Sequence, residues 1–418
     1  MDKTANKPRA GLVAALDVGT SKVCCFIAHV DGDGESRILG VGHQPASGMR
    51  AGAIVDMEAV ETGILSVVRG AEMMAGEHIR EVFVNVTDGA PGSRMVDAEI
   101  PVAGNEISHA DVRRVLDECR LRANGADRAL IHSIPIGYAV DGNRGIRDPR
   151  GMYGERLGVD IHMVTTSPGA VRNLSTCLSG GQLQARATVS TPYASALSTL
   201  VEDEMTLGVT LIDMGGGTTT IAGFADGELI HTGMVPVGGG HVTSDIAVGL
   251  DTPVERAERL KVLHASAVPA PADAHQVIDV PTIGAAPDAA ARQLPRSLLV
   301  GIVQPRIEEI FEMVRDHIED SGLPRAAGRR VVITGGASQI PGVKAVAEPI
   351  LDGKVRLARP QGIPGLAEAT SGPAFATCAG LLRYAALKHA SDPCWGRGRK
   401  QQPGSVLGRM GVWLRENF

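Results

Sequence analysis

The chain has 418 residues, more than one hydrophobic core usually fills, so at least two domains are expected. Its hydrophobic content of 44% excludes a disordered chain. Its net charge of −6 argues against nucleic acid as the main partner.

The cysteines and the apolar runs indicate the compartment. Six cysteines form neither a CxxC pair nor a zinc-binding spacing, which predicts reduced thiols in a cytosolic protein. There is no secretory signal, and no run is long enough to span a bilayer. Any contact with a membrane is therefore expected from the cytosolic side and without crossing.

Apolar runs alternate with helix-like segments along most of the chain, which predicts an α/β fold. Two of the predicted strands end in an aspartate followed by a glycine turn, at Asp17 and at Asp213. This repeated plan indicates a duplicated domain. The predicted strands are 11–16, 23–30, 206–212, 220–224 and 331–333.

Helices and loops fill the rest of the chain. Residues 108–124 are predicted to form an amphipathic helix with Ser108 as its cap and Asp111 three residues later. A second amphipathic helix is predicted over 306–321. The Ala/Pro-rich stretch 265–291 and the basic stretch 391–404 are predicted to be loops or linkers.

The two aspartate–glycine turns contain the groups that a phosphate-binding site needs. Glycine lets backbone N–H groups approach a phosphate oxygen, and neighbouring hydroxyls add donors. A carboxylate at each strand end can hold Mg²⁺ through water, which predicts Asp17 and Asp213 as metal-binding residues. The predicted phosphate-binding residues are Asp17, Gly19, Thr20, Ser21, Lys22, Asp213, Gly215, Gly216, Gly217, Thr218 and Thr219.

A third glycine turn suits a nucleoside. The glycine pair after the strand 331–333 lets the backbone lie against a base or ribose, which predicts that Gly335, Gly336, Ala337 and Ser338 bind adenosine. Glu258 and Lys261 lie three residues apart on a predicted helix and are expected to bracket the ribose and the base edge. Taken alone, each turn is more often a plain turn, and such a charged pair is more often solvated.

The order of the motifs is more specific than any one of them. DVGTSK, STPYASALSTL, LIDMGGGTTTIAGF, VVITGGASQIPGV and SGPAFATCAGLLRYA follow one another between residues 17 and 385. This order resembles the two phosphate motifs, the adenosine motif and the two connecting helices of the actin/DnaK-type chaperone/sugar-kinase superfamily. The resemblance implies an actin-like two-domain nucleotide-binding fold with ATP and Mg²⁺ as ligands.

Within this superfamily the chain resembles the FtsA family of bacterial cell-division proteins. The segments 131–165, 231–250 and 406–418 carry this likeness. It implies a first large subdomain at 11–88 with 163–200 and 366–390, an FtsA-type small subdomain at 89–162, a second large subdomain at 201–225 with 308–365, a second small subdomain at 226–307, a linker at 391–404 and a C-terminal amphipathic helix at 405–418.

The resemblance also implies a function. FtsA anchors the tubulin-like protein FtsZ to the inner face of the cytoplasmic membrane at the division septum, and it assembles with itself and with other division proteins. The FtsZ tail docks in the second small subdomain, so Arg292, Arg296 and Arg306 are expected to meet an acidic tail. Solvated arginines are an equally good interpretation of any one of these three residues.

Two positions depart from related ATP-hydrolysing proteins. Thr220 stands where the second phosphate motif often carries Asp, and Thr191 stands where chaperone-like members carry Glu. No evident residue orients an attacking water, so ATP hydrolysis is expected to be slow or negligible.

The last residues predict a helix that lies on a membrane. At about 100° per residue the apolar side chains fall within an arc of about 140°, with arginines on the other face. A helix docked on its own domain is the alternative. The predicted membrane-binding residues are Val406, Leu407, Met410, Trp413, Leu414 and Phe418.

Two further classes remain open from the sequence. A kinase of the same superfamily would need a catalytic base, for which there is no candidate carboxylate. Another actin-like scaffold, such as an MreB-like or pilus-assembly protein, would lack a small subdomain on the far side of the first large one.

Overall fold

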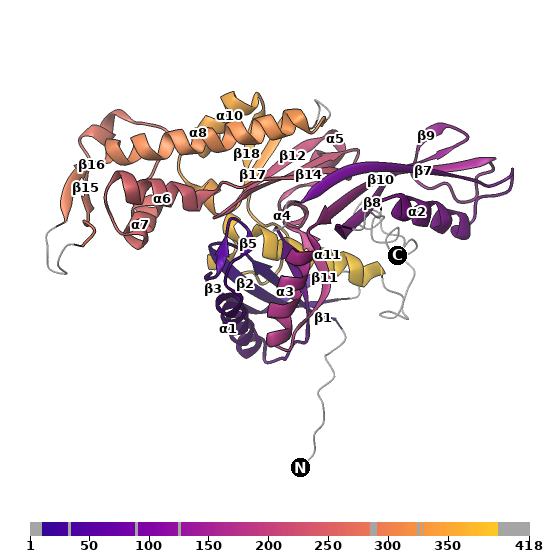
Figure 1. Ribbon diagram of the computed structural model, residues 1–418, viewed down its shortest axis with the longest axis horizontal. Helices are drawn as coiled ribbons and strands as arrows, with labels where there is room; N and C mark the ends of the chain where they lie inside the picture. The colour runs from indigo at the N-terminus through magenta and orange to yellow at the C-terminus, as the bar shows by residue number, and fades with distance from the viewer. Residues whose placement is uncertain are drawn as a thin grey trace, which may run out of the picture.

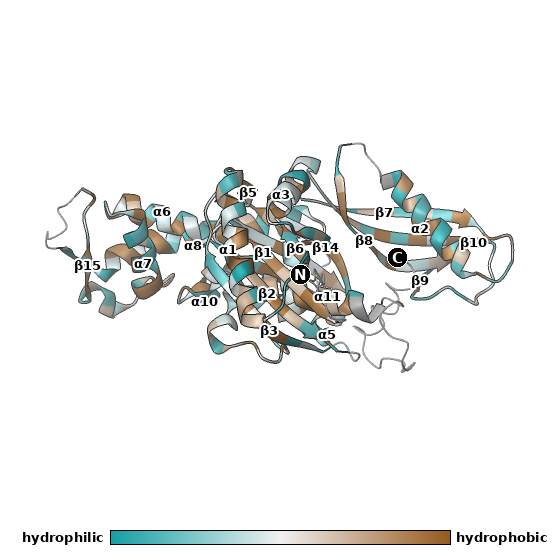
Figure 2. Cartoon of the chain, turned by 90° about the horizontal axis from the view of Figure 1, so that it is seen from below, coloured by the Kyte–Doolittle hydropathy of each residue, from teal (hydrophilic) through white to brown (hydrophobic). Residues whose placement is uncertain are grey.

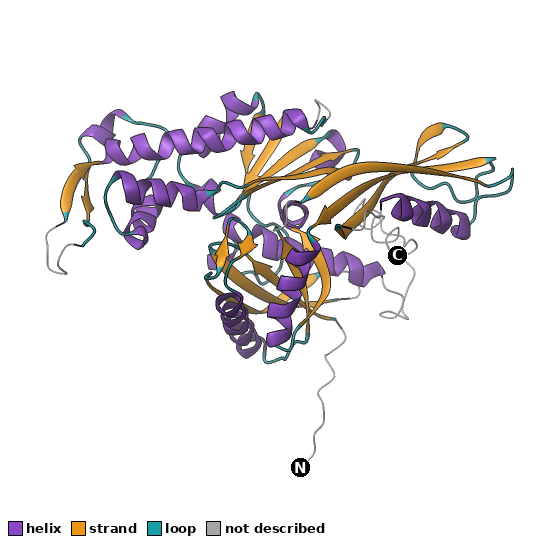
Figure 3. Cartoon of the chain, in the orientation of Figure 1, coloured by secondary structure: helices purple, strands orange, loops and turns teal. Residues whose placement is uncertain are grey.

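The computed structural model describes residues 11–31, 35–87, 91–123, 127–284, 291–323, 327 and 329–391. Two five-stranded sheets with helices packed on them form the centre of the molecule, and smaller units extend from it on opposite sides (Figure 1, Figure 3). The predicted α/β fold is therefore confirmed.

The first large sheet has the strand order β11-β6-β1-β2-β3. The side chains of β1 alternate between two cores, because successive residues of a strand point to opposite faces. Helices α1 (Met57–Ala75) and α3 (Pro168–Gly180) cover the face that carries Leu16. The strands are β1 (Leu12–Val18), β2 (Lys22–Val30), β3 (Ser36–Pro45), β6 (Glu81–Val86) and β11 (Gln184–Ser190), and the short hairpin β4 (Met49–Arg50) and β5 (Ala53–Ile54) follows β3.

The second large sheet repeats the plan of the first. Its order is β14-β13-β12-β17-β18, with three antiparallel strands followed by two parallel ones, as in the first sheet. This is the arrangement that the repeated aspartate–glycine turn predicts. The strands are β12 (Val209–Met214), β13 (Thr219–Ala225), β14 (Glu228–Val235), β17 (Arg330–Thr334) and β18 (Lys354–Leu357).

Two helices lie between the large sheets. α4 (Thr191–Thr199) and α11 (Ala376–Ser391) pack on each other and on strands of the central sheets, within one shared hydrophobic core. Their contact is close, because a Cβ at Gly380 would collide with the carbonyl oxygen of Ala194. Every residue of α4 is buried. The short helix α5 (Glu202–Leu207) leads from α4 to β12.

One small unit is inserted in the sequence between strands β6 and β11 of the first large sheet and extends to one side of the molecule (Figure 1). Its sheet has the order β7-β10-β8-β9, and α2 (His109–Ala123) covers one face of it. The hydroxyl of Ser108 donates to Asp111 and accepts from its backbone N–H, which confirms the predicted cap. The strands are β7 (Gly92–Pro101), β8 (Ala129–Val140), β9 (Asn143–Ile146) and β10 (Arg156–Thr166).

The other small unit is mainly helical and extends to the opposite side (Figure 1). It combines a helix pair and a two-stranded sheet with the first part of the long helix α8, while α10 packs against α8. Its elements are α6 (Gly239–Gly249), α7 (Val254–His264), β15 (Val277–Val280), β16 (Arg292–Pro295) and the first part of α8 (Arg296–Asp320), whereas α10 (Val343–Leu351) also packs on β18 of the second large sheet. In Figure 2 the hydrophobic residues follow the strands of the large sheets, while hydrophilic residues lie on the outer helix faces.

Three predicted boundaries were wrong. α8 begins at Arg296 and runs through Pro305, because Pro305 and Gly301 are both exposed and water can satisfy the carbonyl that loses its N–H partner. Residues 206 and 207 belong to α5, and Gly208, with φ of 92°, separates them from β12. The predicted loop 265–291 contains β15 and the short 3-10 helix Pro271–Ala274.

Part of the linker prediction and the whole C-terminal helix fall outside the described residues, which end at Ser391, the last residue of α11. Among the helices that the structure describes, none is long and apolar enough to cross a membrane. The five cysteines within those residues are free and buried.

A chain of histidines joins the small β-sheet unit to the second large sheet. Ser93 Oγ lies 2.8 Å from His162 Nε2 and 3.3 Å from His231 Nδ1, and His231 Nε2 lies 3.2 Å from His317 Nε2. Burial, with the neighbouring imidazoles, lowers the pKa of His162 and of His231 to about 4. Burial also lowers the pKa of His317, although Asp320 opposes it. The junction is therefore built for neutral imidazoles.

This junction predicts loss of stability in acid. An unfolded histidine has a pKa of about 6.5, so between pH 6.5 and 4 the unfolded chain binds more protons and the free energy of unfolding falls as the pH falls. Urea unfolding measures how far the free energy of unfolding falls when the pH is lowered to 5. This fall should be smaller in His162→Gln than in the wild type, by on the order of 1–2 kcal/mol. The control is His78→Gln, whose side chain is 89% exposed and which should follow the wild type. Equal pH slopes for all three proteins would contradict this account.

Candidate functional site

A cavity of about 1100 Å³ lies between the turns that follow β1 and β12. The sequence predicted most of its wall, and residues from both large sheets and from α6 and α7 line it together. The predicted residues on the wall are Asp17, Gly19, Thr20, Ser21, Lys22, Asp213, Gly215, Gly216, Gly217, Thr218, Glu258, Lys261, Gly335, Gly336 and Ala337.

At one point of the cavity wall the two turns touch, because Gly216 and Gly217 lie against side chains of the first turn. A Cβ at Gly216 would lie 2.6 Å from Ser21 Oγ, and a Cβ at Gly217 would lie 2.6 Å from Thr20 Oγ1. Within the described part of the chain, no acceptor is bonded to the N–H groups of Gly216 and Gly217. Backbone donors on the cavity wall with no Cβ above them are what an anion needs for close approach.

Other backbone contacts fix the shape of the second turn. The N–H groups of Gly239 and Gly240, at the start of α6, donate to the carbonyls of Gly215 and Gly216 at 2.9 and 2.7 Å. Gly335 has φ of +91°, and a Cβ there would collide with Asp213 Oδ1 and with the carbonyl of Met214. The adenosine-type turn is thus pressed directly against the aspartate of the phosphate-type turn.

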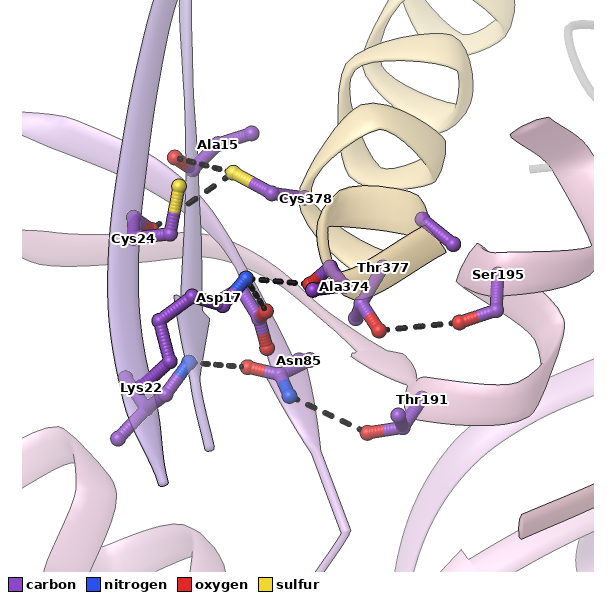
Figure 4. Close-up of polar contacts among 12 residues, drawn as sticks. Ala15, Asp17, Lys22, Cys24, Asn85, Thr191, Ser195, Ala374, Thr377 and Cys378 are labelled. Carbon is purple, nitrogen blue, oxygen red and sulfur yellow. Dashed lines mark hydrogen bonds and ion pairs between the residues drawn. The ribbon is translucent and has the colours of Figure 1, made fainter. Parts of the chain in front are cut away.

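The first turn carries a buried ion pair. Lys22 Nζ lies 3.4 Å from Asp17 Oδ2 and donates to the carbonyl of Ala374 at 2.5 Å (Figure 4). It also lies 4.1 Å from the centre of the Phe375 ring. Burial raises the pKa of Asp17, although Lys22 opposes it. The lysine that was predicted to add positive charge to the cavity is therefore already paired with the aspartate of its own turn.

Asp213 is held differently. Its Oδ2 accepts from Ser195 Oγ at 2.5 Å and from Thr377 Oγ1 at 3.3 Å. These two hydroxyls lie 3.0 Å apart (Figure 4). Burial is the main reason that the pKa of Asp213 is raised to about 6, and the charge of Asp17 adds to it. Burial and a neighbouring carboxylate make the charged form of Asp213 costly, so a cation bound beside the two aspartates is stabilising.

Hydrated Mg²⁺ fits these residues better than a directly ligated metal. Among the described residues there is no group of three or more His, Cys, Asp or Glu side chains that could hold a metal ion. Mg²⁺ typically keeps several waters and uses one or two carboxylates together with phosphate oxygens. Asp17 and Asp213 on the same cavity wall meet that requirement.

Further polar residues on the cavity wall were not predicted as binding residues. Asn85 accepts from the N–H of Val18 and donates to Thr191 Oγ1, which also lies 2.6 Å from Thr87 Oγ1. The hydroxyl of Thr220 is buried and has no hydrogen-bond partner within the described residues. These polar groups come from β6, α4 and β13, so only the folded chain brings them together. The unpredicted cavity residues include Asn85, Thr87, Gly239, Gly240, Thr243, Ile340, Pro341 and Thr377.

Glu258 and Lys261 lie together on α7 at the cavity wall, with Lys261 Nζ 2.6 Å from Glu258 Oε2. Lys261 also donates to the carbonyl of Gly239 and to Thr243 Oγ1, so the pair is tied to α6. The apolar residues Val254, Val262 and Ile340 line the same cavity. This wall offers the mixture of apolar surface and placed polar groups that is typical of a ligand pocket.

Two predicted residues do not reach the cavity. The hydroxyl of Thr219 donates to the carbonyl of Val237 at 2.8 Å, and that of Ser338 donates to the carbonyl of Gly335 at 2.7 Å. Both side chains are buried and do not line the cavity, so their role is to shape the turns.

The three predicted partner-binding arginines lie on the helical small unit, and each has an internal partner. Arg292 donates to the carbonyl of Leu250, and Arg296 pairs with Asp273. Arg306 pairs with Asp245 at 2.5 Å and with Glu309. An acidic partner would therefore have to share these guanidinium groups.

The chain matches known proteins over nearly its full length. A family model described as "Cell division protein FtsA" matches residues 210–380, and one described as "SHS2 domain inserted in FTSA" matches residues 90–165. The cell division protein FtsA of Rhizobium meliloti (strain 1021) is 43% identical over 422 residues, which covers 98% of this chain and 96% of that relative. The FtsA of Escherichia coli (strain K12) is 31% identical over 415 residues, which covers 97% and 98%.

The chain belongs to the FtsA family. Its role therefore lies in cell division, as the sequence resemblance implied. The second family model covers the small β-sheet unit, which identifies β7 to β10 with α2 as the SHS2 insert of FtsA proteins.

Solved structures with low sequence identity share the fold. The PilM–PilN type IV pilus biogenesis complex aligns with a TM-score of 0.63 and 14% identity, covering 91% of this FtsA-family chain and 99% of that chain. MreB5 of Spiroplasma citri bound to ADP aligns with a TM-score of 0.54 and 13% identity, covering 89% and 95%. The predicted actin-like fold with an FtsA-type insert is confirmed.

Adjacent glycines of the adenosine-type turn provide a test of the site's packing. Gly335→Ala should lower the free energy of unfolding by about 1–3 kcal/mol, because the new Cβ meets Asp213 and the φ of +91° strains an alanine. The matched control is Gly336→Ala, where the nearest atom would lie 3.7 Å away. Urea unfolding should separate the two variants, and equal stabilities would show that the turn does not press on Asp213.

Proposed function

We propose that this FtsA-family protein binds Mg²⁺–ATP between its two aspartate–glycine turns and links FtsZ filaments to the membrane. One observation supports nucleotide binding above all others. The two glycine turns meet without room for a Cβ at Gly216 or Gly217, and each turn follows a buried aspartate. MreB5, which shares the fold, is described in complexes with ADP and with AMPPNP. This supports a nucleotide in the corresponding cavity here.

Different residues would bind the phosphates, the metal ion and the adenosine. The backbone of 215–218 and the hydroxyls of Thr20 and Ser21 would bind the phosphates, and Asp17 and Asp213 would hold hydrated Mg²⁺. Bound Mg²⁺ would neutralise phosphate charge next to these carboxylates. Gly335, Gly336 and Ala337 would lie against the adenosine, with Glu258 and Lys261 at its ribose and base edge.

Hydrolysis is proposed to be slow. Thr191 and Thr220 both line the cavity, at the positions where related proteins carry acidic groups. Their hydroxyls can bind a water molecule but cannot take its proton as a carboxylate does. The nucleotide would then act mainly as a bound ligand that sets the conformation.

The FtsZ tail is proposed to dock on the helical small unit, our second small subdomain at 226–307. Exposed apolar side chains project from its helices, with Val248 on α6 84% exposed and Leu263 on α7 59% exposed. Arg292, Arg296 and Arg306 lie on the same unit. Apolar contacts beside partly shared arginines suit a peptide with both apolar and acidic residues.

The remaining subdomains and the membrane contact complete the proposal. The other three subdomains form a body that assembles with itself and with other division proteins. They are the first large subdomain at 11–88, 163–200 and 366–390, the SHS2 subdomain at 89–162 and the second large subdomain at 201–225 and 308–365. The linker 391–404 and the amphipathic helix 405–418 bind the inner face of the cytoplasmic membrane at the septum. One such helix binds weakly, so assembly would supply avidity.

Calorimetry tests the nucleotide site. Wild-type protein should bind Mg²⁺–ATP, and Asp213→Ala should remove most of the binding, because the second turn loses its charge for the metal. Phosphate release by the wild type should stay below about one per second, the low end of ordinary enzyme turnover. Undiminished affinity in a folded Asp213→Ala protein would refute this assignment of the site.

Co-sedimentation tests the linking role. With vesicles containing anionic lipid, the full chain should carry FtsZ into the pellet. A chain lacking 405–418 should bind FtsZ but not vesicles, and so should Trp413→Glu, which places a charge in the apolar arc. Arg306→Glu should bind vesicles but less FtsZ.

The matched control for the last variant is Arg315→Glu, on the same helix α8 but paired with Asp316 at the surface. It should behave as the wild type. Vesicle binding that survives removal of 405–418, or an equal loss of FtsZ binding in both arginine variants, would contradict the proposal.

A further inference from the structure

We propose that Ser195 and Thr377 are positioning residues that hold the Asp213 carboxylate ready for the Mg²⁺ ion of a bound nucleotide. This inference rests on the proposed Mg²⁺–nucleotide site. It assigns a function to two hydroxyls that the motif pattern of the sequence does not single out.

The geometry of the two hydroxyls is specific. Ser195 comes from α4 and Thr377 from α11, 182 residues apart, and both reach the same oxygen of Asp213. Ser195 is fully buried and Thr377 is 7% exposed. Their mutual distance of 3.0 Å lets one hydroxyl support the orientation of the other. Charge-assisted hydrogen bonds of this kind are stronger than neutral ones and fix a carboxylate's rotation.

Neighbouring hydroxyls on α4 show the ordinary alternative. Thr199 Oγ1 donates to the carbonyl of Ser195, and Ser198 Oγ donates to the carbonyls of Ser195 and Ala376. Helical Ser and Thr commonly bond backward to such carbonyls. Ser195 instead donates its hydroxyl to the buried carboxylate of Asp213 on strand β12.

The second oxygen of Asp213 is left for the ligand. Within the described residues no donor reaches Oδ1, which lies close to Gly335, and Asp213 lines the cavity. A carboxylate with one oxygen fixed by hydroxyls and the other free at a cavity can accept from metal-bound water without first rotating. Partners that orient a metal-binding group in this way are typically worth about 10–100-fold in metal affinity.

Because α4 and α11 lie between the two large sheets, the two hydroxyls also tie the second phosphate turn to these helices. On the other side of the cavity, Lys22 ties the first turn to Ala374, two residues before α11. The start of α11 therefore contacts the aspartates of both turns, through Thr377 and through Lys22.

The test separates a metal-positioning role from a packing role. ATP affinity is measured by calorimetry with Mg²⁺ and again with EDTA, and the ratio of the two affinities is the gain due to the metal. Ser195→Ala and Thr377→Val should reduce this ratio by about 10-fold or more. Their affinities in EDTA should stay close to that of the wild type. Thr377→Ser keeps the hydroxyl and should restore the ratio.

Ser198→Ala is the matched control, since it removes a buried hydroxyl from the same helix that does not reach Asp213. Its ratio should equal that of the wild type. If Ser195→Ala does not fold, Thr377→Val, which preserves the shape of the side chain, carries the test alone.

Two results would overturn the inference in different ways. Equal losses of affinity with Mg²⁺ and with EDTA, or an unchanged ratio, would show that the hydroxyls only pack the helices, while the nucleotide site itself stands. Failure of the wild type to bind Mg²⁺–ATP would remove the proposed function and this inference with it.

Discussion

The structure depends on the close approach of two glycine turns over two buried carboxylates. Gly216 and Gly217 face Ser21 and Thr20 with no room for a Cβ, and Asp17 and Asp213 line the same cavity. Burial of both carboxylates is costly unless a cation or a donor compensates. In the protein alone, Lys22 compensates Asp17, and the hydroxyls of Ser195 and Thr377 compensate Asp213.

The fold explains why these groups can meet. The two large sheets repeat one topology, so their first strands deliver equivalent turns to the same cavity. α4 and α11 pack between the sheets through contacts as close as that of Gly380 with Ala194. The SHS2 insert extends away from this centre (Figure 1), whereas the helical small unit lends α6 and α7 to the cavity wall and extends to the opposite side.

Sequence reasoning found the parts of the site that depend on backbone geometry. A glycine in a phosphate turn has a requirement that can be read locally, so the turns at 17–22 and 213–218 and the pair Gly335–Gly336 were all predicted. Asn85, Ser195 and Thr377 could not be assigned in this way, because an isolated Asn, Ser or Thr has many roles. Only tertiary packing brings Asn85 to the first turn and the two hydroxyls to Asp213. The beginning of α8 was missed because a proline usually interrupts a helix, whereas Pro305 lies inside this one.

The central claim is that Mg²⁺–nucleotide occupies the space between the two turns. A crystal structure of the protein grown with Mg²⁺ and AMPPNP tests it most directly. The account predicts phosphates between residues 19–22 and 215–218, Mg²⁺ bound to Asp17 and Asp213 through water, and the adenosine against Gly335 and Gly336. Nucleotide density elsewhere, or a metal that contacts neither aspartate, would contradict the account.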